Sequence, residues 1–89
     1  MFQKYLVELL GTMFISFIIF STGNYLAIGA AVSIAILMGG VISNIAFNPA
    51  IAIAMFYAGK ITSNELIPYV VAEVIGGLAG FELVRRFIH

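Results

Sequence analysis

The chain has 89 residues, of which 63% are hydrophobic and 9% are charged, and its mean hydropathy is +1.16. A soluble domain of this size could not bury so much apolar surface, so the composition predicts an all-α integral membrane protein. Helices are favoured over a membrane barrel, because a barrel would need many strands of alternating polarity and the apolar runs here are continuous. Four Lys and Arg balance four Asp and Glu, which leaves no basic patch for nucleic acid, and the lack of cysteine excludes disulfides and thiolate metal sites.

The first predicted span covers about residues 3–21, the length that a tilted helix needs to cross a bilayer. No small-residue cleavage site follows the start of the chain, so we expect a retained span and not a signal peptide. Glu8 lies about one turn inside this span. Its carboxylate could snorkel to the interface, or it could be buried and accept hydrogen bonds from irregular backbone, and the sequence leaves both alternatives open.

The second predicted span covers about residues 25–43 and is rich in Gly, Ala and Ser, which allow helices to approach closely. Ser43 and Asn44 then interrupt the hydropathy before a further apolar stretch. The whole run from 25 to 58 is too long for one span and too short for two. A span followed by a shorter element resolves this mismatch.

That shorter element is a predicted helix over about residues 49–58. Asn48 is suited to the N-cap, and Pro49 to the first helical position, where its missing N–H has no partner to lose. Gly59 is a plausible stop. A helix of about nine residues rises roughly 14 Å, half of a ~30 Å hydrocarbon core. We therefore expect a re-entrant half-helix whose N-terminus lies near the middle of the membrane.

The last predicted span covers about residues 63–88. Thr62 and Glu65 have the spacing of a capping box, which predicts a helix start at Thr62 or Ser63. Glu73 lies well inside the span, where a carboxyl group should face protein or water and not lipid. It could be protonated or in contact with water. The Gly76-xxx-Gly80 pair indicates a close helix contact.

With three spans and a re-entrant loop, the two ends of the chain lie on opposite sides of the membrane. Lys4 and Lys60 share one side, while Arg85 and Arg86, followed by the terminal His89, mark the other. The Lys and Arg bias that normally fixes orientation is therefore about nil. Either the small charge counts carry no signal, or copies of the chain insert in both orientations. No metal site is expected from the single histidine.

Four segments together resemble one half, specifically the N-terminal half, of the aquaporin and glycerol-facilitator family. One is similar to the family's first-span motif, one to its loop signature, one to the exit from its half-helix, and one to its third-span motif. In the same order, these segments are Glu8-Leu9-Leu10-Gly11-Thr12-Met13-Phe14, Phe47-Asn48-Pro49-Ala50-Ile51-Ala52, Ala58-Gly59-Lys60-Ile61 and Tyr69-Val70-Val71-Ala72-Glu73-Val74-Ile75-Gly76-Gly77. The resemblance covers nearly the whole chain.

The resemblance implies a single half-aquaporin domain over residues 1–89, with three transmembrane helices and one re-entrant half-helix. In the family, two such halves form an inverted repeat, and their Asn-Pro-Ala turns meet at the pore centre. The implied pore motif here is Asn48, Pro49 and Ala50. Glu8 and Glu73 are the implied carboxylates that brace the loops.

This chain departs from the family pattern at several positions. Glu73 replaces the usual Gln, and Asn44-Ile45-Ala46 replaces a typical Gly-Ala-His. Ile51 follows the motif, whereas the second half of family members normally has Arg there. Ile28 stands where family members often place an aromatic residue. We assign Ile28 and Ile51 to the selectivity region or pore wall, and we expect a wider entrance than an aromatic–arginine filter would give.

The resulting functional prediction is a passive channel for water and for small uncharged solutes such as glycerol, located in the plasma or inner membrane. One half-helix lines half a pore, so the predicted unit is an antiparallel homodimer within the lipid, with a tetramer-like assembly as an extension. No cofactor is expected. An enzyme is not expected either, because there is no nucleophile–base pair.

Two other functions stay open. A non-conducting membrane interaction protein would oligomerise through its small-residue faces. A small dual-topology transporter would use Glu8 or Glu73 as a proton-coupled site within the membrane.

Overall fold

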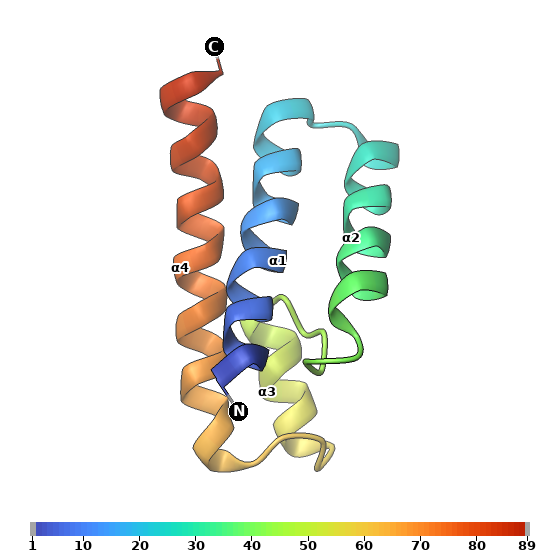
Figure 1. Ribbon diagram of the computed structural model, residues 1–89, viewed down its shortest axis with the longest axis vertical. Coiled ribbons are helices and arrows are strands. Elements are labelled where there is room, and N and C mark those ends of the chain that lie inside the picture. The colour runs from blue at the N-terminus through green and yellow to red at the C-terminus, as the bar shows by residue number, and fades with distance from the viewer. Residues whose placement is uncertain (1, 89) are drawn as a thin grey trace.

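The computed structural model describes residues 2–88, so His89 lies outside the described residues. Four helices follow one another along the chain: α1 (Phe2–Thr22), α2 (Tyr25–Gly39), α3 (Pro49–Tyr57) and α4 (Ser63–Phe87) (Figure 1). Within the described residues there is no strand. The prediction of an all-α chain is therefore confirmed.

Helices α1 and α4 run side by side in the same direction and form the long axis of the molecule (Figure 1). Helix α2 returns in the opposite direction along α1, and α3 packs against α4. The overall extents are 41 × 22 × 20 Å. Because α3 has only nine residues, it begins near the middle of the molecule and ends at the same end as the start of α4 (Figure 1).

The contact between α1 and α4 depends on the two glycines that the sequence marked for helix packing. A Cβ atom at Gly76 would lie 2.3 Å from the carbonyl oxygen of Leu9, and one at Gly80 would lie 2.5 Å from that of Met13. The backbones of the two helices therefore touch. Only glycine leaves room for so close an approach, which lets dispersion forces act between the helices along the contact.

Two of the helices, Phe2–Thr22 and Ser63–Phe87, are long and apolar enough to cross a membrane. Helix α2 is shorter, because it ends at Gly39 and not at residue 43 as the sequence predicted. The consecutive glycines Gly39 and Gly40 weaken the helix at this point. Beyond them, the backbone N–H groups of Ala46 and Phe47 bond to a side chain of α1, so these residues do not extend the helix.

Both predicted helix starts in the second half of the chain are confirmed. Asn48 caps α3 with its side-chain oxygen, and Pro49 is the first helical residue. Thr62 and Glu65 form the capping box of α4: Glu65 Oε1 accepts from the Thr62 N–H at 2.8 Å, and Thr62 Oγ1 accepts from the Glu65 N–H at 3.3 Å. These caps fix where each helix begins and therefore where the intervening loops lie.

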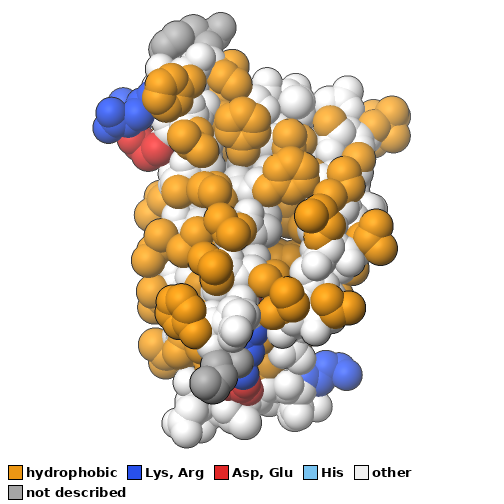
Figure 2. All heavy atoms as spheres, viewed as in Figure 1, with side chains coloured by type: hydrophobic (Ala, Val, Ile, Leu, Met, Phe, Trp, Pro, Cys, Tyr) orange, Lys and Arg blue, Asp and Glu red, His pale blue; other side chains and the backbone are white. Residues whose placement is uncertain are grey.

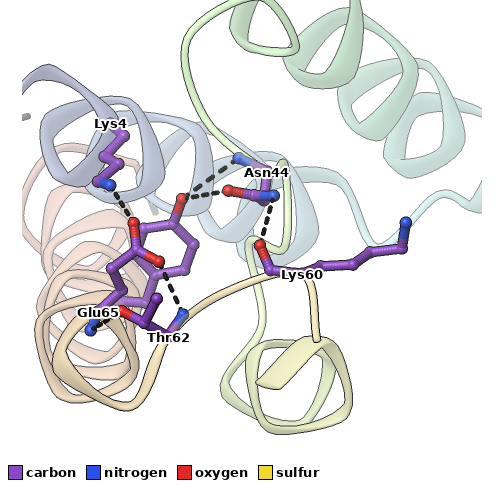
Figure 3. Close-up of polar contacts among 6 residues, drawn as sticks. Lys4, Asn44, Lys60, Thr62 and Glu65 are labelled. Atoms are coloured by element: carbon purple, nitrogen blue, oxygen red, sulfur yellow. Dashed lines mark hydrogen bonds and ion pairs between the residues drawn. The ribbon is translucent and has the colours of Figure 1, made fainter. Parts of the chain in front are cut away.

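The face of the molecule seen in Figure 2 is apolar over most of its length, and charged side chains gather near its two ends. At one end Lys4 of α1 forms an ion pair with Glu65 of α4 (Figure 3). At the other end Glu82 accepts hydrogen bonds from Arg85 and Arg86. An apolar band between two charged ends is the surface that a bilayer requires.

Candidate functional site

Glu8 of α1 has a fully buried side chain, which forms hydrogen bonds with the loop between α2 and α3. Its Oε1 accepts a hydrogen bond from the N–H of Phe47 at 2.7 Å. Its Oε2 accepts from the N–H of Ala46 at 3.2 Å and from the Ser43 hydroxyl at 2.8 Å. This burial argues against the alternative in which Glu8 snorkels to the interface. The carboxylate supplies acceptors to backbone groups that no helix satisfies.

The backbone that Glu8 holds is strained. Ile45 and Phe47 have φ angles of 55° and 52°, in the left-handed region that is unfavourable for residues with a Cβ atom and worst for a β-branched one. The hydrogen bonds to Glu8 offset this strain, because the carboxylate binds the N–H groups of Ala46 and Phe47 only when the loop has this shape. The result is a loop that places Asn48 in a fixed position.

A second set of contacts holds the same loop from the side of α4 (Figure 3). The hydroxyl of the fully buried Tyr69 donates to Asn44 Oδ1 at 2.8 Å and accepts from the Asn44 N–H at 3.3 Å. Asn44 Nδ2 donates to the carbonyl of Lys60 at 3.4 Å. Sequence reasoning did not assign Ser43, Asn44 or Tyr69 to the site. The available signal was a run of polar groups inside an apolar stretch.

Asn48 stands at the N-terminus of α3 and is exposed. Its Oδ1 accepts from the N–H of Ala50 at 2.8 Å, which leaves the Nδ2 amide to donate elsewhere. A helix N-terminus carries a partial positive charge of about half an electron. Asn48 therefore presents a hydrogen-bond donor at the positive end of a helix.

A groove of about 660 Å³ lies along α1 and α4 beside this turn. Most of its wall is apolar, with side chains such as Phe20, Phe81 and Leu78. Its polar side chains come from Thr12, Ser16, Asn48 and Glu73. The structure therefore brings together residues from the first helix, the loop and the last helix that are far apart in sequence.

Glu73 differs from Glu8 in its surroundings. Its side chain is 1% exposed, and neither carboxyl oxygen has a hydrogen-bond partner. The hydroxyl of Thr12, which lines the same groove, is also buried without a partner. Burial of a carboxyl group without a hydrogen-bond donor costs free energy, and Glu73 is such a group.

The other predicted residues lie in different places. Pro49 lines the groove together with Asn48 and Glu73, whereas Ile28 and Ile51 do not line it. Ile28 is half-buried on α2, and Ile51 is exposed on α3. In the described part of the chain no group of three or more acidic or histidine side chains could hold a metal ion.

Comparison with known proteins gives a consistent picture. The family model of the major intrinsic proteins matches residues 1–89. The glycerol uptake facilitator protein-like 6 of Lactiplantibacillus plantarum is 35% identical over 97% of this chain and 44% of the relative. An aquaporin Z of Photorhabdus laumondii is 34% identical over 88% of this chain and 40% of the relative. The aquaglyceroporin AqpS of Rhizobium meliloti is 33% identical over 70% of this chain and 27% of the relative. No solved structure matches the chain significantly.

The chain thus spans less than half the length of the relatives that it matches. The family match, in contrast, extends over all of it. Because the whole chain matches the family model and a relative at 35% identity covers nearly all of it, the chain is a membrane protein that belongs to the major intrinsic protein family.

Proposed function

We propose that the chain forms half of a passive channel for water and small uncharged solutes, in the membrane of the cell. The observation that carries this proposal is the Asn48 turn, which is buttressed by Glu8 and presents an exposed amide at the N-terminus of α3. Relatives named as aquaporins and as a glycerol uptake facilitator support the solute class. Glycerol is the larger permeant to test.

In this proposal α1, α2 and α4 cross the bilayer, and α3 is re-entrant. The length of α3, about 14 Å for nine residues, matches half of a ~30 Å hydrocarbon core. Its N-terminus then lies near the membrane midplane, and its C-terminus returns to the interface from which α4 starts. Irregular backbone at that depth requires internal acceptors, which Glu8 and Tyr69 supply.

Asn48 acts on the permeant in two ways. Its Nδ2 amide donates a hydrogen bond to a passing water or hydroxyl oxygen. The positive end of α3 disfavours cations and protons at the same point. Ile28 and Ile51 form apolar wall in place of a charged and aromatic filter, so the entrance should admit glycerol-sized solutes as well as water.

A second half must complete the pore, because one half-helix lines only one side. An antiparallel pair related by a two-fold axis in the membrane plane brings two Asn48 turns together and points two α3 helices at one another. The second half is another copy of this chain in our proposal, and a larger tetramer-like assembly is compatible with it. A parallel pair would place both α3 helices on the same side and leave the pore incomplete.

Water flux tests the role of Asn48. Stopped-flow shrinkage of proteoliposomes in sucrose should be fast for the wild type and reduced several-fold by Asn48→Ser, because serine keeps the helix cap but lacks the amide. Asn24→Ser is the matched control, since Asn24 caps α2 in the same manner, with Oδ1 3.0 Å from the Ala27 N–H. Equal fluxes for all three chains would remove Asn48 from the mechanism. Wild-type flux no faster than empty liposomes, with insertion shown, would contradict the homodimeric channel.

Crosslinking tests the antiparallel arrangement, since the chain has no cysteine of its own. Ala50→Cys lies at the N-terminus of α3 and Tyr57→Cys at its C-terminus, and both positions are exposed. An antiparallel pair should crosslink through position 50 and not through position 57, because the two C-termini lie on opposite faces of the membrane. Crosslinking of equal efficiency at both positions would indicate a parallel pair.

A further inference from the structure

Two buried carboxyl groups from different helices lie next to each other beneath the Asn48 turn. Glu8 of α1 is 0% exposed and Glu73 of α4 is 1% exposed. The carboxyl group of Glu73 has the side chain of Glu8 and the backbone N–H of Asn48 as polar neighbours. Neither of its oxygens forms a hydrogen bond. The pair therefore links α1, the loop and α4 at one point.

The two groups have unequal environments. Glu8 accepts three hydrogen bonds, one on Oε1 and two on Oε2. A carboxylate offers about four lone-pair sites, so Oε1 can accept one more. Glu73 accepts none. The acceptor sites of Glu8 are thus largely filled by donors of the loop, while neither carboxyl oxygen of Glu73 has a hydrogen-bond partner within residues 2–88.

The cations of the described residues lie elsewhere. Lys4 pairs with Glu65, roughly two turns before Glu73 on α4. Lys60 is exposed in the loop between α3 and α4. Arg85 and Arg86 pair with Glu82 at the far end of the same helix. Two adjacent anions without a cation, both out of water, repel strongly and lose their hydration. One added proton removes the repulsion and also creates the donor that the pair lacks.

We propose that Glu73 is a proton-binding site, whose carboxyl group holds the single proton of the pair and donates it in a hydrogen bond to Glu8. The proton completes the acceptor set of Glu8 and joins α4 to the loop that positions Asn48. Its removal places a second negative charge beside Glu8, which weakens the hydrogen bonds that Glu8 accepts from Ala46 and from the strained residue Phe47. The proton is therefore part of the structure that shapes the turn.

Infrared difference spectroscopy tests the proton directly, without reference to transport. The wild type in lipid should show the carbonyl band of a protonated carboxyl group at neutral pH and lose it in strongly alkaline buffer. Glu73→Gln, whose amide keeps N–H donors for Glu8, should lack the band at neutral and at alkaline pH. Glu82→Gln is the control and should keep it, because Glu82 is exposed and paired with arginines. A wild type without the band at neutral pH, or a Glu73→Gln variant that retains it, would overturn the proposal.

Water flux against pH tests the consequence for the turn, and this step rests on the proposed function. Wild-type flux should fall in the pH range in which the band disappears, whereas Glu73→Gln should conduct equally on both sides of that range. Constant wild-type flux while the band is lost would overturn the link between the proton and the loop. A chain that shows the band but conducts no water would contradict the channel and leave the proton site standing.

Discussion

At the scale of single residues, the site depends on the hydrogen bonds that Glu8 accepts from the loop. One carboxylate supplies acceptors to two backbone N–H groups and one hydroxyl in a segment with two left-handed non-glycine residues. No neutral side chain of similar size offers as many acceptor sites. The sequence alone left the position of Glu8 undecided between interface and interior.

Removal of this carboxylate should destabilise the fold. Glu8→Ala leaves the N–H groups of Ala46 and Phe47 buried without partners, which we expect to lower the free energy of unfolding by roughly 3 kcal/mol. Thermal unfolding in detergent checks this value. Glu82→Ala is the control: it removes only exposed ion pairs and should change stability far less than Glu8→Ala does. Similar losses for the two variants would mean that the loop is held by other contacts.

At the scale of elements, the contact between α1 and α4 sets the geometry of the site, because Glu8 and Glu73 lie on these two helices. Their backbones approach through Gly76 and Gly80, and the Ser16 hydroxyl donates to the carbonyl of Gly77 at 2.7 Å. An aromatic contact between Phe20 and Phe81, with ring centroids 4.9 Å apart, continues the interface toward the far end. A wider separation would move the two carboxyl groups apart.

Alanine substitutions at two glycines separate packing from helix propensity. Gly76→Ala places a methyl group against the Leu9 carbonyl, so we expect a loss of about 1–3 kcal/mol. Gly29→Ala on α2 meets nothing within 4 Å and should be neutral or stabilising by up to about 1 kcal/mol, because alanine favours helix. The melting temperatures of both variants in detergent give the comparison. A stable Gly76→Ala chain would contradict the close α1–α4 contact.

At the scale of the whole molecule, the charges at the two ends are balanced. Lys4, Lys60 and Glu65 lie at one end, and Arg85, Arg86 and Glu82 at the other, so each end carries two cations and one acid. Such a chain has no Lys and Arg bias to orient it. Insertion in both orientations is what an antiparallel pair of identical chains requires.

Labelling of a single cysteine tests this orientation. In cells, Asn64→Cys at the exposed start of α4 should react with a membrane-impermeant maleimide in about half of the molecules, because the chain lacks a charge bias. Adding Arg85→Gln and Arg86→Gln removes the cations of one end, so position 64 should then face the cytoplasm and become protected. Adding Glu82→Gln instead should leave the labelled fraction unchanged, because acidic residues contribute little. Full labelling or full protection of the starting chain would contradict dual insertion.

The sequence by itself determined the helical class, the membrane environment and the starts of α3 and α4. These properties depend on local signals, namely apolar runs, Asn48 before Pro49, and the spacing of Thr62 and Glu65, so they can be identified without knowing the fold. The motif segments also led to the family whose model matches residues 1–89.

Only the tertiary structure decided what the polar groups inside the chain do. Glu8 meets residues of a loop more than thirty positions away, and Tyr69 meets Asn44 across two elements. These contacts keep the segment after α2 out of a helical conformation, since the N–H groups of Ala46 and Phe47 are bound by Glu8. Glu73 lacks a hydrogen-bond donor for the same reason, because the packing of α1 and the loop decides which groups lie next to its carboxyl group. Spacing along the chain gives no measure of such distances in space.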